Sequence, residues 1–250
     1  PRGPVAITLA MLSLQHISKS YWRGRHEIVV LDDVSFDVDA GEFAAIFGQR
    51  ASGKTTLLRI AAGMERPDTG AVHFAGEDMS TLSRPALLTG LHQQIGWVRR
   101  PGPSTLTMRM LDYVALPLLR DMRHAEAHRR ATSALKRVHA AELARAKWHH
   151  LSDAERTLVM IAQAIVRTPA LLLADDPTMG LDFTEREIVA ELLRETAQAN
   201  GMAVLMTVPE LPDSMSSHRV MSLSGGELIE AKRRAPGEVI ELRRERGSSA

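Results

Sequence analysis

A strand, a glycine-rich loop and the start of a helix follow one another in residues 43–56, which read FAAIFGQRASGKTT. Residues 43–47 are all apolar, and a continuous apolar run is typical of a strand buried on both faces of a sheet. The loop that follows has the pattern G-x-x-x-x-G-K-[ST], in which backbone N–H groups cradle phosphate oxygens at a helix start. Residues 54–62 have a helical pattern that stops at Gly63. The stretch therefore predicts a nucleotide-binding α/β core.

The loop supplies most of the candidate nucleotide-binding residues, which are Gly48, Gln49, Arg50, Ala51, Ser52, Gly53, Lys54, Thr55 and Thr56. Lys54 is expected to reach the β- and γ-phosphates, and the Thr55 hydroxyl is expected to ligate Mg²⁺. The bare pattern occurs by chance in about 1% of chains of this length. The strand before it and the helix after it favour a phosphate site over a glycine-rich turn without a ligand.

A second apolar strand ends in two carboxylates. Residues 171–174 are Leu-Leu-Leu-Ala, and Asp175 and Asp176 follow them. Because ligands bind beyond the carboxyl ends of parallel strands, Asp175 is expected to hold Mg²⁺ through water, opposite the loop. Asp176 is the candidate catalytic residue, since it stands where a base or water-orienting group would lie. Paired acids after a strand can also be a helix cap or a turn.

The rest of the chain divides by pattern. Residues 12–47 carry strand signals, whereas residues 81–166 are mostly helical in pattern, which predicts an inserted helical subdomain over about 82–167. From residue 171 onward strand and helix alternate, with one helix expected to be capped by Thr184 and closed by Asn200-Gly201. The nucleotide-binding domain is thus expected over 11–230.

The two ends of the chain are expected to lie outside this domain. Residues 1–10 are interpreted as an extension. Residues 231–250 mix basic and acidic side chains, which favours a solvated helix with a frayed end over contact with lipid headgroups.

Composition excludes several classes of protein. The 250 residues include 31 Lys+Arg against 30 Asp+Glu, which argues against a nucleic-acid binder held by bulk charge. There is no cysteine, which excludes a disulfide scaffold and a cysteine nucleophile. The apolar runs are shorter than the 18 or more residues of a membrane span. A soluble protein is expected, whose membrane role, if any, comes from a partner.

Several motifs together resemble the nucleotide-binding subunit of an ABC transporter. They are the loop at 48–55, the segment LLLADDPT at 171–178, the Gly180-Leu181-Asp182 that follows, and Leu151-Ser152 upstream. The resemblance covers about residues 12–230. Residues 106–118 are similar to the branch that serves lipoprotein release, macrolide efflux and the FtsE/FtsX cell-division pair.

This resemblance implies a P-loop core with a mixed or parallel sheet, an antiparallel β subdomain and an inserted helical subdomain. It implies ATP and Mg²⁺ as cofactors, with Tyr21 stacking on adenine and with Ser152 and Asp182 in the nucleotide site. A core tyrosine near a sheet edge is the alternative for Tyr21. The resemblance also implies that the partners of the protein are an integral-membrane permease subunit and a second ABC subunit. The location implied is cytoplasmic, on the inner face of the cell membrane through the membrane partner.

The signature loop departs from the family pattern. It is usually LSGGQ or LSGGE, and here it reads Leu151-Ser152-Asp153-Ala154-Glu155. Ser152 and Glu155 also have the spacing of a capping box, so their presence can be purely structural. Asp153 places a carboxylate where the partner's γ-phosphate would dock, and the repulsion at an effective dielectric of 20 is roughly 4 kcal/mol. We therefore expect a weakened ATP-bound dimer.

A consensus copy of the signature, LSGGE at residues 223–227, lies after the apolar strand that ends in Asp175 and Asp176. Two short strand patterns flank it, and adjacent glycines between strands are typical of a two-residue hairpin turn. We interpret it as a hairpin.

Three further positions of the ATPase pattern are altered. Arg100 stands at the expected Q-loop glutamine, Val208 at the switch histidine, and Asp176 at the catalytic glutamate. Aspartate keeps the charge but is shorter by about 1.5 Å. Valine cannot donate a hydrogen bond to a phosphate. Arg100 could supply positive charge near the γ-phosphate, or it could face solvent or the partner.

Three functions compete on these grounds. The first is a transport motor, with or without a consensus subunit as its pair, that couples ATP binding and slow hydrolysis to a membrane partner. The second is a regulatory or structural ATP switch with little or no turnover. The third is a P-loop protein of another class, such as a small-molecule kinase, which the ungapped residues 151–182 disfavour.

Overall fold

A seven-stranded sheet forms the centre of the computed structural model, which describes residues 10–81, 92–99, 107–209, 219–232 and 241–243. The strands lie in the order β11 (Glu241–Arg243), β10 (Glu227–Lys232), β9 (Arg219–Ser224), β3 (Phe43–Phe47), β8 (Ala203–Val208), β7 (Leu171–Asp175) and β6 (Ile95–Arg99). The five strands from β9 to β6 run parallel, and β10 and β11 are antiparallel additions at one edge.

The central strands are buried on both faces, as the apolar runs predict. In β3, Phe43 and Ala45 join one buried cluster, whereas Ala44 and Ile46 join the other. β7 and β8 alternate in the same way. A strand between two apolar layers needs no polar face, which explains why these segments are continuous apolar runs.

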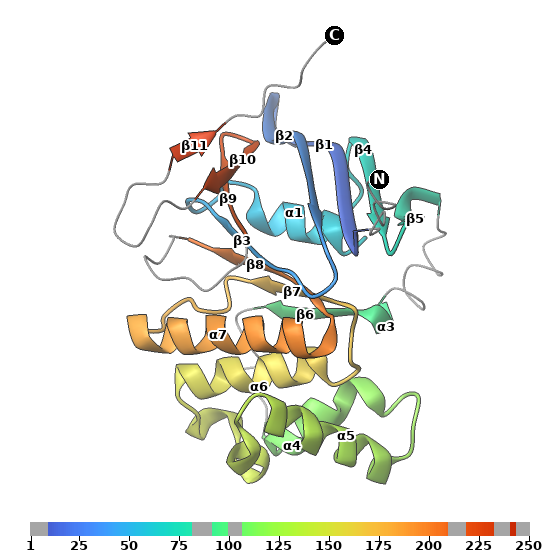
Figure 1. Cartoon of the computed structure of the whole chain (residues 1–250), viewed down its shortest axis with the longest axis vertical. Helices are drawn as coiled ribbons and strands as arrows, with labels where there is room; N and C mark the ends of the chain where they lie inside the picture. The colour runs from blue at the N-terminus through green and yellow to red at the C-terminus, as the bar shows by residue number, and fades with distance from the viewer. Residues whose placement is uncertain (1–9, 82–91, 100–106, 210–218, 233–240, 244–250) are drawn as a thin grey trace, which may run out of the picture.

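A four-stranded antiparallel sheet and one helix cover the first face. The strands lie in the order β2 (His26–Val38), β1 (Leu12–Arg23), β4 (Thr69–Phe74) and β5 (Glu77–Asp78). Helix α1 (Lys54–Ala61) lies between the two sheets in Figure 1 and buries Leu57, Leu58 and Ile60. A 3-10 turn, η1 (Met79–Thr81), follows β5.

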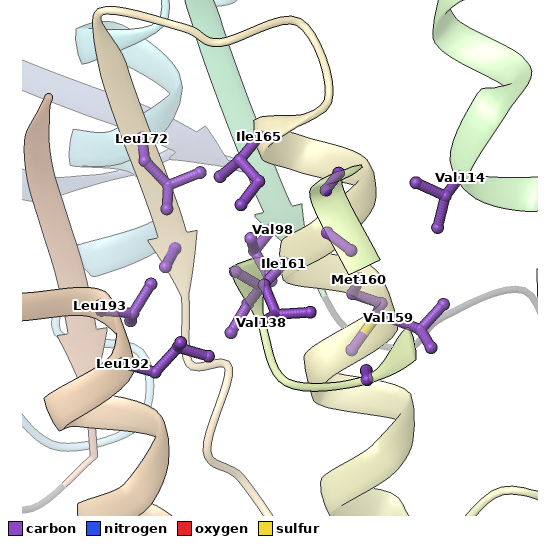
Figure 2. Close-up of a cluster of buried hydrophobic side chains, with 14 of the residues drawn as sticks. Val98, Val114, Val138, Val159, Met160, Ile161, Ile165, Leu172, Leu192 and Leu193 are labelled. Carbon is purple, nitrogen blue, oxygen red and sulfur yellow. The ribbon is translucent and has the colours of Figure 1, made fainter. Parts of the chain in front are cut away.

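Helices cover the second face (Figure 1). They are α4 (Met110–Ala115), α5 (His124–Arg137), α6 (Asp153–Ile165) and α7 (Phe183–Asn200), with 3-10 turns η3 (Leu116–Leu118), η4 (Ala141–Arg145) and η5 (Trp148–His150). A short helix, α3 (His92–Gln94), precedes β6. In Figure 2, Leu172 of β7 lies with Ile161 and Ile165 of α6 and with Leu192 and Leu193 of α7. This cluster attaches the helices to the sheet.

The expected α/β architecture is confirmed, and three local predictions are wrong. Residues 95–99 fall in the segment of mainly helical pattern, but they form β6 at the edge of the central sheet. The N-cap of α7 is Asp182, which forms a capping box with Glu185, not Thr184. The predicted C-cap is correct, since Gly201 ends α7 in the left-handed conformation.

The third error concerns the charged tail, where a helix was expected. Residues 241–243 form β11, which pairs antiparallel with residues 230–232 of β10. The rest of 233–250 and residues 1–9 lie outside the described residues. The boundaries of the domain and of its helical subdomain stay predictions.

The LSGGE copy at residues 223–227 is a hairpin, as predicted. It joins β9 to β10, and Gly225 and Gly226 both have positive φ, 60° and 86°. Within the described ranges, none of the helices has the length and apolar character needed to cross a membrane.

Gly96 in β6 provides a test of how tightly the helices pack on the sheet. A Cβ atom at this position would lie 2.5 Å from the backbone oxygen of Ala164 in α6. We expect Gly96→Ala to lower the free energy of unfolding by about 1–3 kcal/mol, measured by chemical denaturation. Gly201→Asn is the control, since nothing lies within 4 Å there and asparagine tolerates its positive φ. An unchanged stability in Gly96→Ala would show that α6 can shift freely on the sheet.

Candidate functional site

The phosphate loop 48–53 is held so closely between its neighbours that two positions require glycine. A Cβ at Gly48 would lie 2.4 Å from the Leu223 carbonyl oxygen of the β9–β10 hairpin. Gly53 has φ 104°, and a Cβ there would lie 2.7 Å from the Val30 carbonyl oxygen of β2. The Gly48 amide also donates to the Val208 carbonyl oxygen at 3.3 Å. Both ends of the loop are therefore fixed by surrounding strands.

The Lys54 ammonium lies inside this loop. Its Nζ donates to the carbonyl oxygens of Gly48 and Gln49, at 2.5 and 2.8 Å, and lies 3.5 Å from Ser52 Oγ. Burial lowers the pKa of Lys54 below its ordinary value, and the carboxylates of Asp176 and Asp175 act in the opposite direction. Lys54 is thus a partly desolvated cation close to both acids, which suits it to an anionic ligand.

Hydrogen bonds connect the start of α1 to β7, the strand that ends at Asp175. Thr55 Oγ1 donates to Asp175 Oδ2 at 2.9 Å, with Oδ1 at 3.1 Å. Thr207, the residue of β8 that is paired with Asp175, also donates to Asp175 Oδ1, at 3.1 Å. The Asp176 amide donates to Thr207 Oγ1 at 3.1 Å. The structure therefore brings Thr55, Asp175 and Asp176 together, as the sequence predicts.

Sequence reasoning missed Thr207. Its hydroxyl bridges the Asp175 carboxylate and the Asp176 backbone amide. The contact depends on the strand register, which pairs Asp175 of β7 with Thr207 of β8. A polar residue at the carboxyl end of a strand beside the acidic strand was the available signal.

Tyr21 lies near this helix start from the opposite sheet. Its side chain is 38% exposed, which excludes the core-tyrosine alternative. Its hydroxyl donates to Glu65 Oε1 at 2.5 Å and lies 3.3 Å from Thr56 Oγ1 in the first turn of α1. The ring is therefore connected to the phosphate loop through Thr56.

The predicted signature residues form a complete helix cap. The Ser152 side chain accepts from the Glu155 amide, and the Glu155 side chain accepts from the Ser152 amide. Asp153 is exposed, and its Oδ1 lies 3.0 Å from Arg156 Nη1. The carboxylate that the sequence places at this helix start therefore has a cation beside it.

Two other residues that the sequence analysis singled out, Asp182 and Val208, have structural roles in the fold. Asp182 uses its carboxylate to cap α7, accepting from the Glu185 amide at 2.8 Å. Val208 is 2% exposed and packs in the cluster on the helix-covered face of the sheet, opposite to Thr207. Arg50 is exposed in the loop. Arg100 lies outside the described residues.

The arrangement corresponds to a known family. A family profile described as ABC transporter matches residues 31–179, which is more than half of the chain. The chain belongs to the ABC transporter family. It is an ATP-binding subunit of an ABC transporter complex, and the P-loop fold with a mixed sheet, an antiparallel β subdomain and helices is the fold of that family.

Two curated relatives are both named lipoprotein-releasing system ATP-binding protein LolD. That of Pseudomonas syringae pv. tomato is 33% identical over 223 residues, which is 89% of this chain and 98% of the relative. That of Chromohalobacter salexigens is 34% identical over 221 residues, covering 88% and 93%. The chain is similar to both over nearly its whole length.

Solved structures agree with the fold. The cassette described as the dimeric structure of MJ0796, a bacterial ABC transporter cassette, superposes with a TM-score of 0.78 at 28% identity, covering 87% of this chain and 96% of that one. A post-hydrolysis state of MJ0796 bound to ADP and Pi gives 0.77. CbiO1 from Clostridium perfringens, at 23% identity and a TM-score of 0.77, shares the fold.

The position of Lys54 predicts its share of ATP affinity. Lys54→Ala removes a charge-assisted contact to phosphate worth about 1.5–3 kcal/mol, so we expect ATP binding to weaken by about ten- to a hundredfold. Isothermal titration calorimetry measures it. Lys136→Ala, on the exposed face of α5, is the matched control. Equal affinity in wild type and Lys54→Ala would contradict the placement of the triphosphate.

Proposed function

We propose that this subunit couples ATP binding, and a slow ATP hydrolysis, to a conformational change of an integral-membrane partner. The observation that carries the proposal is the hydrogen-bonded chain from Thr55 through Asp175 and Thr207 to the Asp176 backbone amide, with the Lys54 ammonium close to both carboxylates. Relatives at 33–34% identity that are named as parts of a lipoprotein-releasing system support a related export or release role.

The donor set suits a magnesium nucleotide. Thr55 and Asp175 offer hard oxygen ligands, and Mg²⁺ in nucleotide sites is typically held by one or two protein oxygens, phosphates and waters. When bound, the ion would neutralise charge on the phosphates. Lys54 would pair with the β- and γ-phosphates, Tyr21 would stack on the base, and Asp176 would orient the attacking water.

Slow turnover is proposed from two residues. The Asp176 carboxylate is about 1.5 Å shorter in reach than a glutamate, and a misplacement of 1 Å can cost about 10²-fold in rate. Val208 is apolar and faces the buried helix side of the sheet, so its side chain offers nothing to a phosphate. If turnover is absent altogether, the protein is instead a regulatory switch driven by ATP binding.

Pairing with a second subunit is proposed from the relatives. MJ0796 is described as dimeric, and CbiO1 as part of the complex cbiONQ. In the arrangement that we propose, the start of α6 at Ser152 meets the nucleotide of the second subunit. The helical subdomain and the loop that begins at Arg99 would dock on the membrane partner, and the subunit would then lie on the inner face of the cell membrane.

Turnover should respond to the length of the acid at position 176. We expect Asp176→Glu to raise kcat for ATP by about ten- to a hundredfold, because it restores the missing reach. Val208→His should add to this only in the Asp176→Glu background, and it requires the new histidine to turn out of the buried cluster, because the two groups would then act on one water and one phosphate. Phosphate release by the complex with its membrane partner measures the effect.

The controls separate chemistry from folding. Val208 is buried, so thermal unfolding of the histidine variant must be measured alongside its rate. Asp176→Asn should abolish turnover while ATP still binds. A wild-type kcat of tens per second, common among enzymes, would show that Asp176 is long enough.

Charge at the start of α6 should tune ATP-dependent pairing. In an Asp176→Asn background, Arg156→Gln removes the cation beside Asp153 and should weaken the dimer by about tenfold, after allowance for exposure and salt. Asp153→Gly with Ala154→Gly should tighten it, because backbone N–H groups then face the phosphate. Sedimentation with ATP measures both. Equal dimerisation of all variants would mean that this helix start does not meet a phosphate.

A further inference from the structure

A polar network joins the end of α1 to the Tyr21 ring. Glu65 lies just beyond α1, and its backbone amide donates to the Arg59 carbonyl oxygen at 3.2 Å. Its carboxylate accepts a hydrogen bond from the Tyr21 hydroxyl, with the two oxygens 2.5 Å apart. Since a phenol has one hydrogen, the contact between Tyr21 and Thr56 at 3.3 Å is then donated by Thr56.

Lys19 completes this network on β1. Its Nζ lies over the Tyr21 ring, 5.6 Å from the centroid, and 4.0 Å from Glu65 Oε1. It also donates to Asp68 Oδ1 at 2.8 Å. The Lys19 ammonium therefore offsets two carboxylates close to a site for an anion, and it covers one face of the ring.

We propose that Glu65 is a positioning residue, which holds the Tyr21 ring in one orientation and thereby sets how strongly the site binds the base of a nucleotide. The proposal rests on the function proposed above, in which Tyr21 stacks on the base. Glu65 and Lys19 both lie outside the sequence motifs at 48–56, 151–155 and 171–182.

The physical reason is preorganisation. Tyr21 lies towards the exposed end of the β1–β2 hairpin, paired with Ile28, and residues 21–29 are all exposed. Stacking needs a defined ring plane, and a ring that is already fixed loses less conformational entropy when a base binds. The hydroxyl contacts to Glu65 and Thr56 fix the ring at its far end. Thr56 lies in the first turn of α1, which begins at the phosphate loop, and Glu65 lies just beyond the end of that helix.

The protonation state agrees with this role. Burial, and then the hydrogen bond to Glu65, raise the pKa of Tyr21 above its ordinary value. The phenol therefore keeps its hydrogen and remains a donor to Glu65 at neutral pH.

The test compares two ligands that differ in the base. ATP carries a base, whereas inorganic tripolyphosphate carries only the phosphate chain, and both can be titrated by calorimetry on the whole protein. We expect Glu65→Ala and Tyr21→Phe each to weaken ATP binding by about two- to tenfold, the range for one hydrogen bond, and to leave tripolyphosphate binding unchanged. Glu65→Gln, which keeps an acceptor oxygen, should recover part of the loss. Glu142→Ala, an exposed acid on η4, is the control.

A double-mutant cycle separates positioning from general structure. Because Glu65 acts through the hydroxyl, Tyr21→Phe with Glu65→Ala should bind ATP no more weakly than either single variant. Additive losses, or an equal loss for tripolyphosphate, would overturn the proposal by showing that Glu65 supports the loop itself.

A different result would show that the proposed function itself is wrong. If Tyr21→Ala leaves the ratio of ATP to tripolyphosphate affinity unchanged, the base does not lie on Tyr21, and both proposals about this ring are wrong. If Tyr21→Ala lowers that ratio while Glu65→Ala does not, the base platform stands and only the positioning role is lost. A wild type that binds neither ligand would refute both.

Discussion

The parallel register of the central strands is the constraint on which the site depends. Asp175 and Thr207 are paired neighbours, and β3 ends beside them at Phe47, paired with Val208. Three chain segments that are far apart in sequence therefore end at one edge, where the phosphate loop, the acids and the bridging hydroxyl meet. No side chain in this group would have a partner if one strand slipped, because a one-residue shift turns every side chain to the opposite face.

The same alternation explains why the end of β8 carries two different chemistries. Thr207 shares the face of Ala203 and Leu205 towards α1, whereas Val208 shares the face of Val204 and Met206 towards the helices. The hydroxyl therefore belongs to the site and the valine belongs to the core. Valine at position 208 is compatible with the fold because it extends the buried cluster between the sheet and the helices.

Much of the fold could be predicted from sequence, because its decisive segments have strong local signals. The apolar runs gave the buried strands, the glycine pattern gave the loop, and the paired glycines at 225–226 gave the hairpin. β6 was missed because five residues beside a long helical pattern carry little periodic signal, and its identity as a strand depends on pairing with β7. β11 likewise depends on a distant partner. In the site, Lys54, Thr55 and Asp175 were predicted from their motifs. Thr207 and Glu65 were not, because each acts through a contact between residues far apart in sequence.

The β9–β10 hairpin has a mechanical consequence. The Asp32 amide of β2 donates to the Gly226 carbonyl oxygen at 2.9 Å, while Val30 of β2 lies against Gly53 and Leu223 lies against Gly48. β2 is thus attached to the phosphate loop directly and through the hairpin, and β1, which carries Tyr21, is paired along β2. The separation of the Tyr21 ring and the phosphate loop is therefore set by strand pairing and by backbone contacts of β2. If a base stacks on Tyr21 while its phosphates occupy the loop, as proposed above, the ligand must span a distance that the backbone of β1 and β2 sets.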